Sequence, residues 1–117
     1  MKSRSASLFL ILLLPLLVVA TARMGRLVGG WEKIKDVKDP HIQEIGKFAV
    51  SEYNKQSKGA LEFKDVVKGE SQVVSGTNYR LVIEAKKGES IGKYQALVWE
   101  KAWQHFMELT SFKPVAN

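Results

Sequence analysis

The chain has 117 residues, a formal net charge of +6 and no cysteine. This length suits one small domain, and the absence of thiols excludes a cysteine nucleophile, thiolate metal ligands and disulfide bonds. The basic residues are scattered among acids, which predicts a solvated basic surface rather than a nucleic-acid binder. Neither His41 nor His105 has the spacing of a metal site or a catalytic triad. We therefore expect neither an enzyme nor a cofactor or metal site.

The N-terminal segment has the pattern of a secretory signal peptide. Lys2 and Arg4 precede an apolar stretch at residues 8–20, and Ala20-Thr21-Ala22 supplies small residues at a cleavage site. A membrane anchor is the alternative, but the apolar stretch is short for a span of roughly 20 residues. We expect residues 1–22 to be removed and residues 23–117 to form the folded domain, without a membrane segment.

Two glycines stand near the start of this domain. Gly29 and Gly30 follow the apolar pair Leu27-Val28. Consecutive glycines indicate a flexible joint or a place where the backbone approaches another surface closely. An idle terminus is the alternative. Residues 31–34 could then form a short strand whose Trp31 and Ile34 help to cover the core.

The first long element is predicted to be a helix at residues 40–58. Asp39-Pro40 combines an N-cap acceptor with proline at the first helical position, and Gly59 is a natural stop. Gly46 costs roughly 1 kcal/mol relative to alanine inside a helix, which suggests close approach to a sheet. Apolar residues recur every three or four positions and form one stripe: Ile42, Ile45, Phe48, Ala49 and Tyr53.

After Gly59 the apolar period changes to two, which predicts consecutive strands. The first begins near Leu61, with a possible bulge at Val66-Val67. The others are expected at residues 79–86, 91–101 and 104–112. Short connections favour an antiparallel sheet with the helix across its apolar face, an α+β domain in which residues 31–34 add a fifth strand. Trp99, like Trp31, is assigned to the core.

The turn between the first two long strands is apolar. It reads Gln72-Val73-Val74-Ser75-Gly76, where a hairpin tip normally carries polar residues facing water. Exposed apolar groups on a tip suggest a surface for a partner, although the valines could be ordinary strand-end hydrophobes. A second turn carries Ala102-Trp103, whose indole is either exposed or buried under the last strand.

These features occur together, in this order, in the cystatins, which inhibit papain-like cysteine peptidases. Gly29-Gly30, residues 72–76 and Trp103 match the three family features, and residues 45–54 look like the helix sequence of plant cystatins. The chain thus resembles a phytocystatin, which implies a cystatin-like fold with one long helix packed across a curved antiparallel sheet of four to five strands. Ala102 replaces the usual proline of that family, which implies a less preorganised second turn.

The resemblance also implies a mechanism and a partner. Leu27 and Val28 would enter non-primed pockets, Gly29 and Gly30 would bend the chain away from the thiolate, and Gln72, Val73, Val74, Ser75 and Gly76 would cover the catalytic centre. Ala102 and Trp103 would pack on the primed side. The implied function is reversible inhibition by a secreted or vacuolar monomer, directed at endogenous, herbivore or pathogen peptidases in plant defence. The alternatives are a non-inhibitory storage, taste or ligand-binding protein of the same fold and a basic protein binding membranes or polysaccharide.

Overall fold

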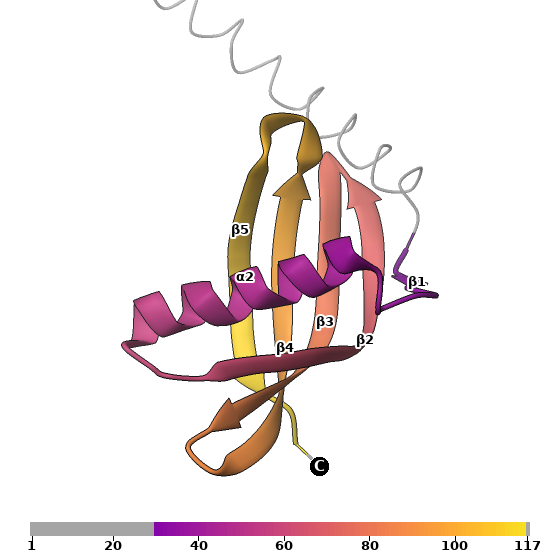
Figure 1. The fold of residues 1–117 in the computed structure, drawn as a ribbon. Coiled ribbons are helices and arrows are strands. Elements are labelled where there is room, and N and C mark those ends of the chain that lie inside the picture. The colour runs from indigo at the N-terminus through magenta and orange to yellow at the C-terminus, as the bar shows by residue number, and fades with distance from the viewer. Residues whose placement is uncertain (1–29, 117) are drawn as a thin grey trace, which may run out of the picture.

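The computed structural model describes residues 30–116, in which one helix lies across a five-stranded sheet (Figure 1). The sheet order is β1-β2-β3-β4-β5, and every neighbouring pair is antiparallel. The α+β arrangement expected from the sequence is therefore confirmed. The elements are β1 (Glu32–Lys33), α2 (Pro40–Ser57), β2 (Glu62–Val74), β3 (Gly76–Lys87), β4 (Ser90–Lys101), the 3-10 helix η1 (Ala102–Gln104) and β5 (Phe106–Pro114).

Helix α2 begins and ends within one residue of its predicted limits. The Asp39 carboxylate accepts a hydrogen bond from the His41 backbone N–H at 2.8 Å, and Pro40 occupies the first turn. Lys58 then ends the helix in the left-handed conformation, with φ 56°. No helix within residues 30–116 is long and apolar enough to cross a membrane.

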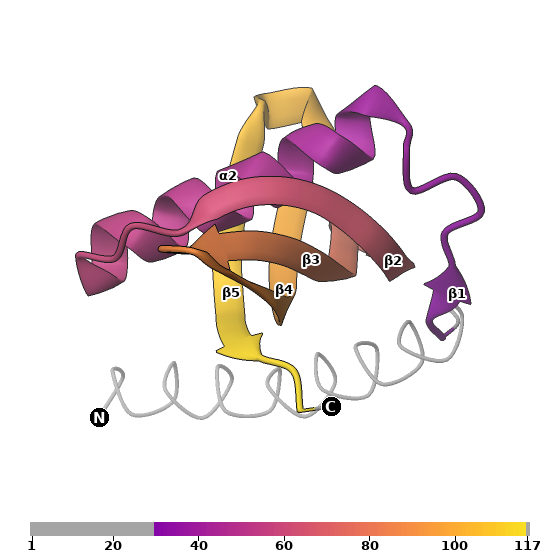
Figure 2. The same cartoon turned by 60° about the horizontal axis from the view of Figure 1, so that its bottom comes forward.

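The sheet curves around α2, whose axis runs across the strands (Figures 1 and 2). The expected close approach at Gly46 is confirmed, since a Cβ there would lie 2.5 Å from Val66 Cγ2 and 2.8 Å from Phe63 Cε1. The bulge expected near Val66 is also present, as a register shift between Val66 and Lys68. Buried side chains on the helix-facing side of the sheet form the centre of the core: Val66, Leu81, Ile83, Ala85, Ala96 and Val98.

The strand limits at the two turns differ from the predictions. Strands β2 and β3 continue to the very tip of their hairpin, because Val74 pairs directly with Gly76. The last strand begins at Phe106 rather than at residue 104, because residues 102–104 form a turn of 3-10 helix. Apolar alternation could not show either feature, since both depend on backbone conformation at a turn.

The assignment of Trp31 and Trp99 to the core is wrong. Both are half-buried, and neither belongs to the core cluster. Trp99 alternates with the buried Val98 and Glu100, so it lies on the sheet face opposite the helix. Arg80 lies on that same outer face, because the next residue, Leu81, is buried. Its guanidinium lies 4.2 Å from the centroid of the Trp31 ring. Ile34, by contrast, packs against the core as expected.

Candidate functional site

Two hairpin turns lie side by side at one end of the sheet. We call residues 72–76 the first loop and residues 102–105 the second loop. The first joins β2 to β3, and the second joins β4 to β5. Thr77, directly after the first loop, pairs with Glu100, shortly before the second loop. The two loops therefore lie at the same end of neighbouring strands (Figure 1). The sheet therefore brings together two segments that are about thirty residues apart in the sequence.

The first loop is a very tight turn with Ser75 alone at its tip, since Val74 and Gly76 face each other as a pair. Gly76 has φ +93°, a conformation that side chains strongly disfavour. A Cβ at Gly76 would also collide with the Glu100 backbone oxygen and lie 3.1 Å from Lys101 Cγ. Glycine is thus needed here both for the turn and for the close approach of the tip to β4.

Large apolar side chains are exposed at this end of the molecule. Val73 and Trp103 are each 63% exposed, and Phe106, directly after the second loop, is 38% exposed. Trp103 is therefore not buried under the last strand, which excludes that alternative. Among residues 30–116, Ile91 is the other large hydrophobic residue with comparable exposure, and it lies at the opposite end of the sheet. Such clustering of exposed apolar groups is typical of a protein-binding surface.

The second loop follows directly from β4. Lys101 is extended, with φ −117° and ψ 93°, and the His105 N–H closes the turn on the Ala102 carbonyl at 3.1 Å. His105 itself adopts a left-handed conformation with φ 49°. An extended residue is favoured before proline, so the backbone path at Lys101 is compatible with proline at position 102. Alanine at position 102 keeps that path while restricting the free loop less.

Three residues that contact the loops were not predicted from the sequence: Trp99, Lys101 and Phe106. The Trp99 indole N–H donates a hydrogen bond of 2.8 Å to the Ser75 carbonyl. Its ring meets Phe106 edge-on, with centroids 5.9 Å apart, and the Lys101 ammonium lies 4.7 Å from the Trp99 centroid and 5.2 Å from that of Phe106. No clear signal for them is present in the sequence, because Trp99 belongs to an apolar run in which alternation does not identify the outer face.

A hydrogen-bonded pair, Glu100 and His41, lies beneath the second loop. Glu100 is only 7% exposed, and its carboxylate bonds to His41 Nε2 at 2.8 Å, while His41 Nδ1 lies 3.2 Å from Glu44. The hydrogen bond to Glu100 is the main cause that raises the pKa of His41 above its usual value, against the opposing effect of burial. Burial, followed by the charge of Glu100, raises the pKa of Tyr79. The pair links the start of α2 to the end of β4.

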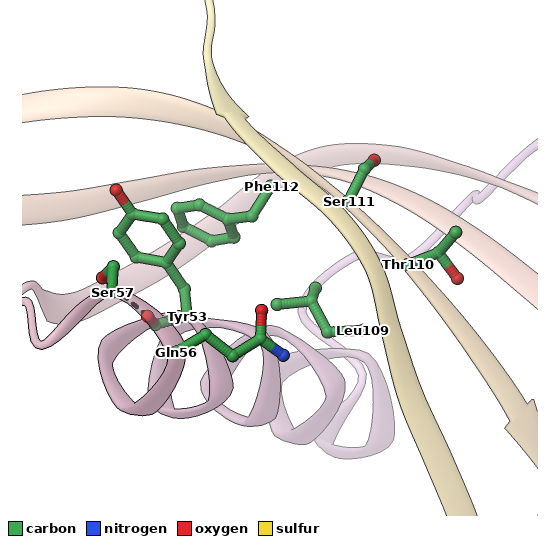
Figure 3. Close-up of a pocket in the computed structure, with 7 residues that line it drawn as sticks. All are labelled: Tyr53, Gln56, Ser57, Leu109, Thr110, Ser111 and Phe112. Atoms are coloured by element: carbon green, nitrogen blue, oxygen red, sulfur yellow. Dashed lines mark hydrogen bonds between the residues drawn. The ribbon is translucent and has the colours of Figure 1, made fainter.

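A pocket between α2 and β5 offers no charged acid–base group. Its volume is about 220 Å³, and the Tyr53 and Phe112 rings stack there with centroids 4.3 Å apart; the lining residues are drawn in Figure 3. Its lining includes no charged side chain, so it offers no strong acid or base. Within the part of the chain that the structure describes, no group of three or more histidine and acidic side chains is placed to hold a metal ion.

The predicted site residues fall into two sets. Gln72, Val73, Val74, Ser75 and Gly76 lie next to Ala102 and Trp103 at the loop end. Leu27, Val28 and Gly29, like the predicted signal peptide, lie outside the described residues. Gly30 is exposed just before β1, and a Cβ on it would meet nothing within 4 Å. Because Glu32 pairs with Ser71 in antiparallel register, residues 30–31 precede β1 on the side nearer the first loop.

Comparisons with known proteins identify relatives over most of the chain. Residues 34–115 match a family model described as "Aspartic acid proteinase inhibitor". The chain is 55% identical over 108 residues to cysteine proteinase inhibitor 5 of Arabidopsis thaliana, covering 92% of this chain and 85% of that protein. It is 52% identical over 87 residues to cysteine proteinase inhibitor 1 of Actinidia chinensis, covering 74% and 75% of the two chains.

Solved structures agree on the fold. The salivary cystatin of the soft tick Ornithodoros moubata matches with a TM-score of 0.66 at 24% identity, covering 75% of this chain and 98% of that one. The squash aspartic acid proteinase inhibitor matches with a TM-score of 0.59 at 28% identity, covering 76% and 95%. One helix held in a curved antiparallel sheet, with these neighbours, defines the class of cystatin-like inhibitors.

The chain belongs to the cystatin family of plant proteinase inhibitors. This confirms the resemblance and the cystatin-like fold predicted from the sequence. The relatives are inhibitors of proteinases rather than enzymes, in agreement with the expectation that the chain is not an enzyme.

Proposed function

We propose that this chain is a reversible, tight-binding inhibitor of papain-like cysteine peptidases. The observation that carries the proposal is the pair of loops fixed side by side, with Val73 on the first and Trp103 on the second each 63% exposed. Two rigid apolar projections at one end of a small domain form a wedge that can enter a peptidase cleft. The printed names of the plant relatives, cysteine proteinase inhibitors, support the same class of target.

In this mechanism the inhibitor excludes substrate without forming a covalent bond. The first loop covers the catalytic centre and Trp103 packs on the primed side, while Leu27 and Val28 occupy non-primed pockets. Gly29 and Gly30 turn the chain away before a peptide bond reaches the thiolate. Because both loops are short and held by β4, they lose little conformational entropy on binding, which favours tight association over an interface of roughly 1,600 Å².

Aspartic peptidases are the second candidate target. The family model and the squash inhibitor structure carry that description. The plant relatives at 52% and 55% identity are much more similar to this chain than the squash protein at 28%, and they are named for cysteine proteinases. We therefore favour the cysteine class and use an aspartic peptidase as the comparison in the test.

The N-terminal sequence supports a proposal for the site of action. We propose that residues 1–22 direct the chain into the secretory pathway, so that the inhibitor meets its targets in the apoplast or the vacuole. Detection of mature protein beginning near Arg23 outside plant cells or in vacuoles would support this route. An uncleaved protein remaining in the cytosol would contradict it.

The direct test is an activity titration of papain and, in parallel, of pepsin with the purified protein. We expect papain activity to fall to zero at one inhibitor per active enzyme and to recover on dilution, while pepsin stays active. Trp103→Ala should weaken papain inhibition by at least about 30-fold, the size of an interface hot spot, with an unchanged melting temperature because the side chain is exposed. Full papain activity at excess inhibitor would overturn the proposal, and inhibition of pepsin alone would favour the second candidate.

A further inference from the structure

Trp99 is attached to the tip of the first loop. It lies on the outer face of β4, paired with Asn78 of β3 and Glu108 of β5. Its indole N–H donates to the Ser75 carbonyl at 2.8 Å. Ser75 is the single residue at the tip, between the paired Val74 and Gly76, so its carbonyl lies beyond the last pair of the ladder. This hydrogen bond thus ties the tip to a neighbouring strand.

The same side chain contacts the base of the second loop. Phe106, which follows His105 directly, presents its ring to the Trp99 ring at an interplanar angle of 79°. The Lys101 ammonium, from the residue that precedes the second loop, lies over both rings at 4.7 and 5.2 Å. Edge-to-face pairs and cation–π contacts of this kind each favour one relative arrangement of the groups. We call Trp99, Lys101 and Phe106 the clamp.

Gly76 is matched to this arrangement. A Cβ at Gly76 would lie 3.1 Å from Trp99 Nε1, tighter than ordinary van der Waals contact. The absence of a side chain at Gly76 therefore lets the indole reach the carbonyl of the preceding residue. The glycine and the tryptophan act together, although they lie on different strands and 23 positions apart in the sequence.

We propose that Trp99 is a positioning residue that fixes the first loop relative to the second in the free inhibitor. This inference rests on the proposed function, and it concerns a residue in the sheet rather than the tips that enter the cleft. If the indole bond is lost, the first loop samples several conformations, and only a fraction of molecules presents the wedge at any moment. The apparent affinity then falls in proportion to that fraction, and the association rate falls with it.

The kinetics separate positioning from contact. Loss of a contacting side chain acts mainly through faster dissociation. Loss of preorganisation lowers the population that can bind, so association slows while dissociation changes little. One hydrogen bond of ordinary net strength corresponds to an effect of about 2- to 10-fold.

The test compares Trp99→Phe with Trp31→Phe. Phenylalanine at position 99 keeps a ring beside Phe106 and Lys101 but removes the donor to Ser75. Trp31 is a suitable control, because its ring is also half-buried on the outer face and its cation–π partner is Arg80 rather than a residue of either loop. Amide hydrogen exchange in the free proteins, papain association and dissociation rates, and melting temperature are measured for the parent and both variants.

We expect faster exchange at residues 73–77 in Trp99→Phe alone, with unchanged exchange in the core, and papain association about 2- to 10-fold slower. Trp99→Tyr, which also lacks the indole donor, serves if the phenylalanine variant is too unstable. Loop exchange equal to that of Trp31→Phe would overturn the proposal, as would an unchanged association rate with papain that the parent inhibits. Failure of the parent to inhibit papain would instead contradict the proposed function, while the exchange measurement would still test the positioning.

Discussion

Strand β3 has a glycine-containing turn at each end, and the two turns differ in what surrounds them. Gly76 has φ +93° and Gly88 has φ +62°, so both residues use backbone conformations that favour glycine. A Cβ at Gly88 would meet nothing within 4 Å, whereas one at Gly76 would collide with the backbone of Glu100. A glycine at positive φ thus closes a turn in open space at one end of β3 and a loop packed against β4 at the other.

The exposed side chains at the two ends make the same contrast. Val73 is 63% exposed at the loop end and Ile91 is 62% exposed at the far end, so exposure alone does not distinguish them. Val73 lies on a loop beside the one that carries Trp103, whereas Ile91 follows the polar turn Lys87-Gly88-Glu89-Ser90. An interaction surface is marked by several apolar groups held together on anchored backbone, not by one exposed hydrophobic residue.

The strongest test of this contrast introduces the same charge at both ends. Val73→Asp should weaken papain inhibition by at least about 30-fold, because a carboxylate would have to lose its water on entering the cleft. Ile91→Asp should leave inhibition unchanged. Both positions are exposed, so neither variant should lower the melting temperature much. The measurements are inhibition constants and melting curves of the two variants. Equal inhibition by both would contradict the claim that only the loop end binds the peptidase.

The two glycines allow a second comparison, measured as stability. Gly88→Ala should cost about 1 kcal/mol, because alanine at a positive φ is strained even in open space. Gly76→Ala should cost more, about 2–4 kcal/mol, because strain is joined by overlap with β4. Denaturant unfolding of both variants gives the difference. Equal losses would mean that the tip of the first loop is not held closely against β4.

Among these tests, titration of His41, which lies at the loop end, should change the stability by the smallest amount. Its folded-state pKa is raised chiefly by Glu100, so the stabilising contribution is fully present below its unfolded value of about 6.5 and is lost as pH rises through the folded value. Since the imidazole is partly exposed, the contribution is at most about 1 kcal/mol. Melting curves of the parent and His41→Gln should differ most near pH 5 and converge toward pH 8. A difference that does not depend on pH would exclude this linkage.

The sequence predicted the parts of the molecule that depend on local patterns. The Asp39-Pro40 start, the close approach at Gly46 and the antiparallel order of the strands all follow from spacing and from residue types. The two loops were also found, because their residues depart from ordinary turn composition. The assignment of Gly30 and Trp103 to the candidate site, by contrast, depended on the family resemblance.

What the sequence could not predict depends on contacts between distant strands. Trp99 looked like a core residue because Leu97, Val98 and Trp99 form a continuous apolar run, in which alternation does not identify the inner face. Its bond to Ser75 exists because β3 and β4 place the two residues next to each other. The burial of Glu100 has the same origin, since His41 reaches it from the start of α2 across 59 positions.

In the proposed mechanism the loop end of the sheet, rather than the far end, meets the peptidase. Amide hydrogen exchange of the inhibitor, measured alone and saturated with papain, tests this most directly. We expect slower exchange at residues 72–77 and 101–106 in the complex, with no change at residues 87–91. Protection at residues 87–91, or tight inhibition without protection of either loop, would contradict it.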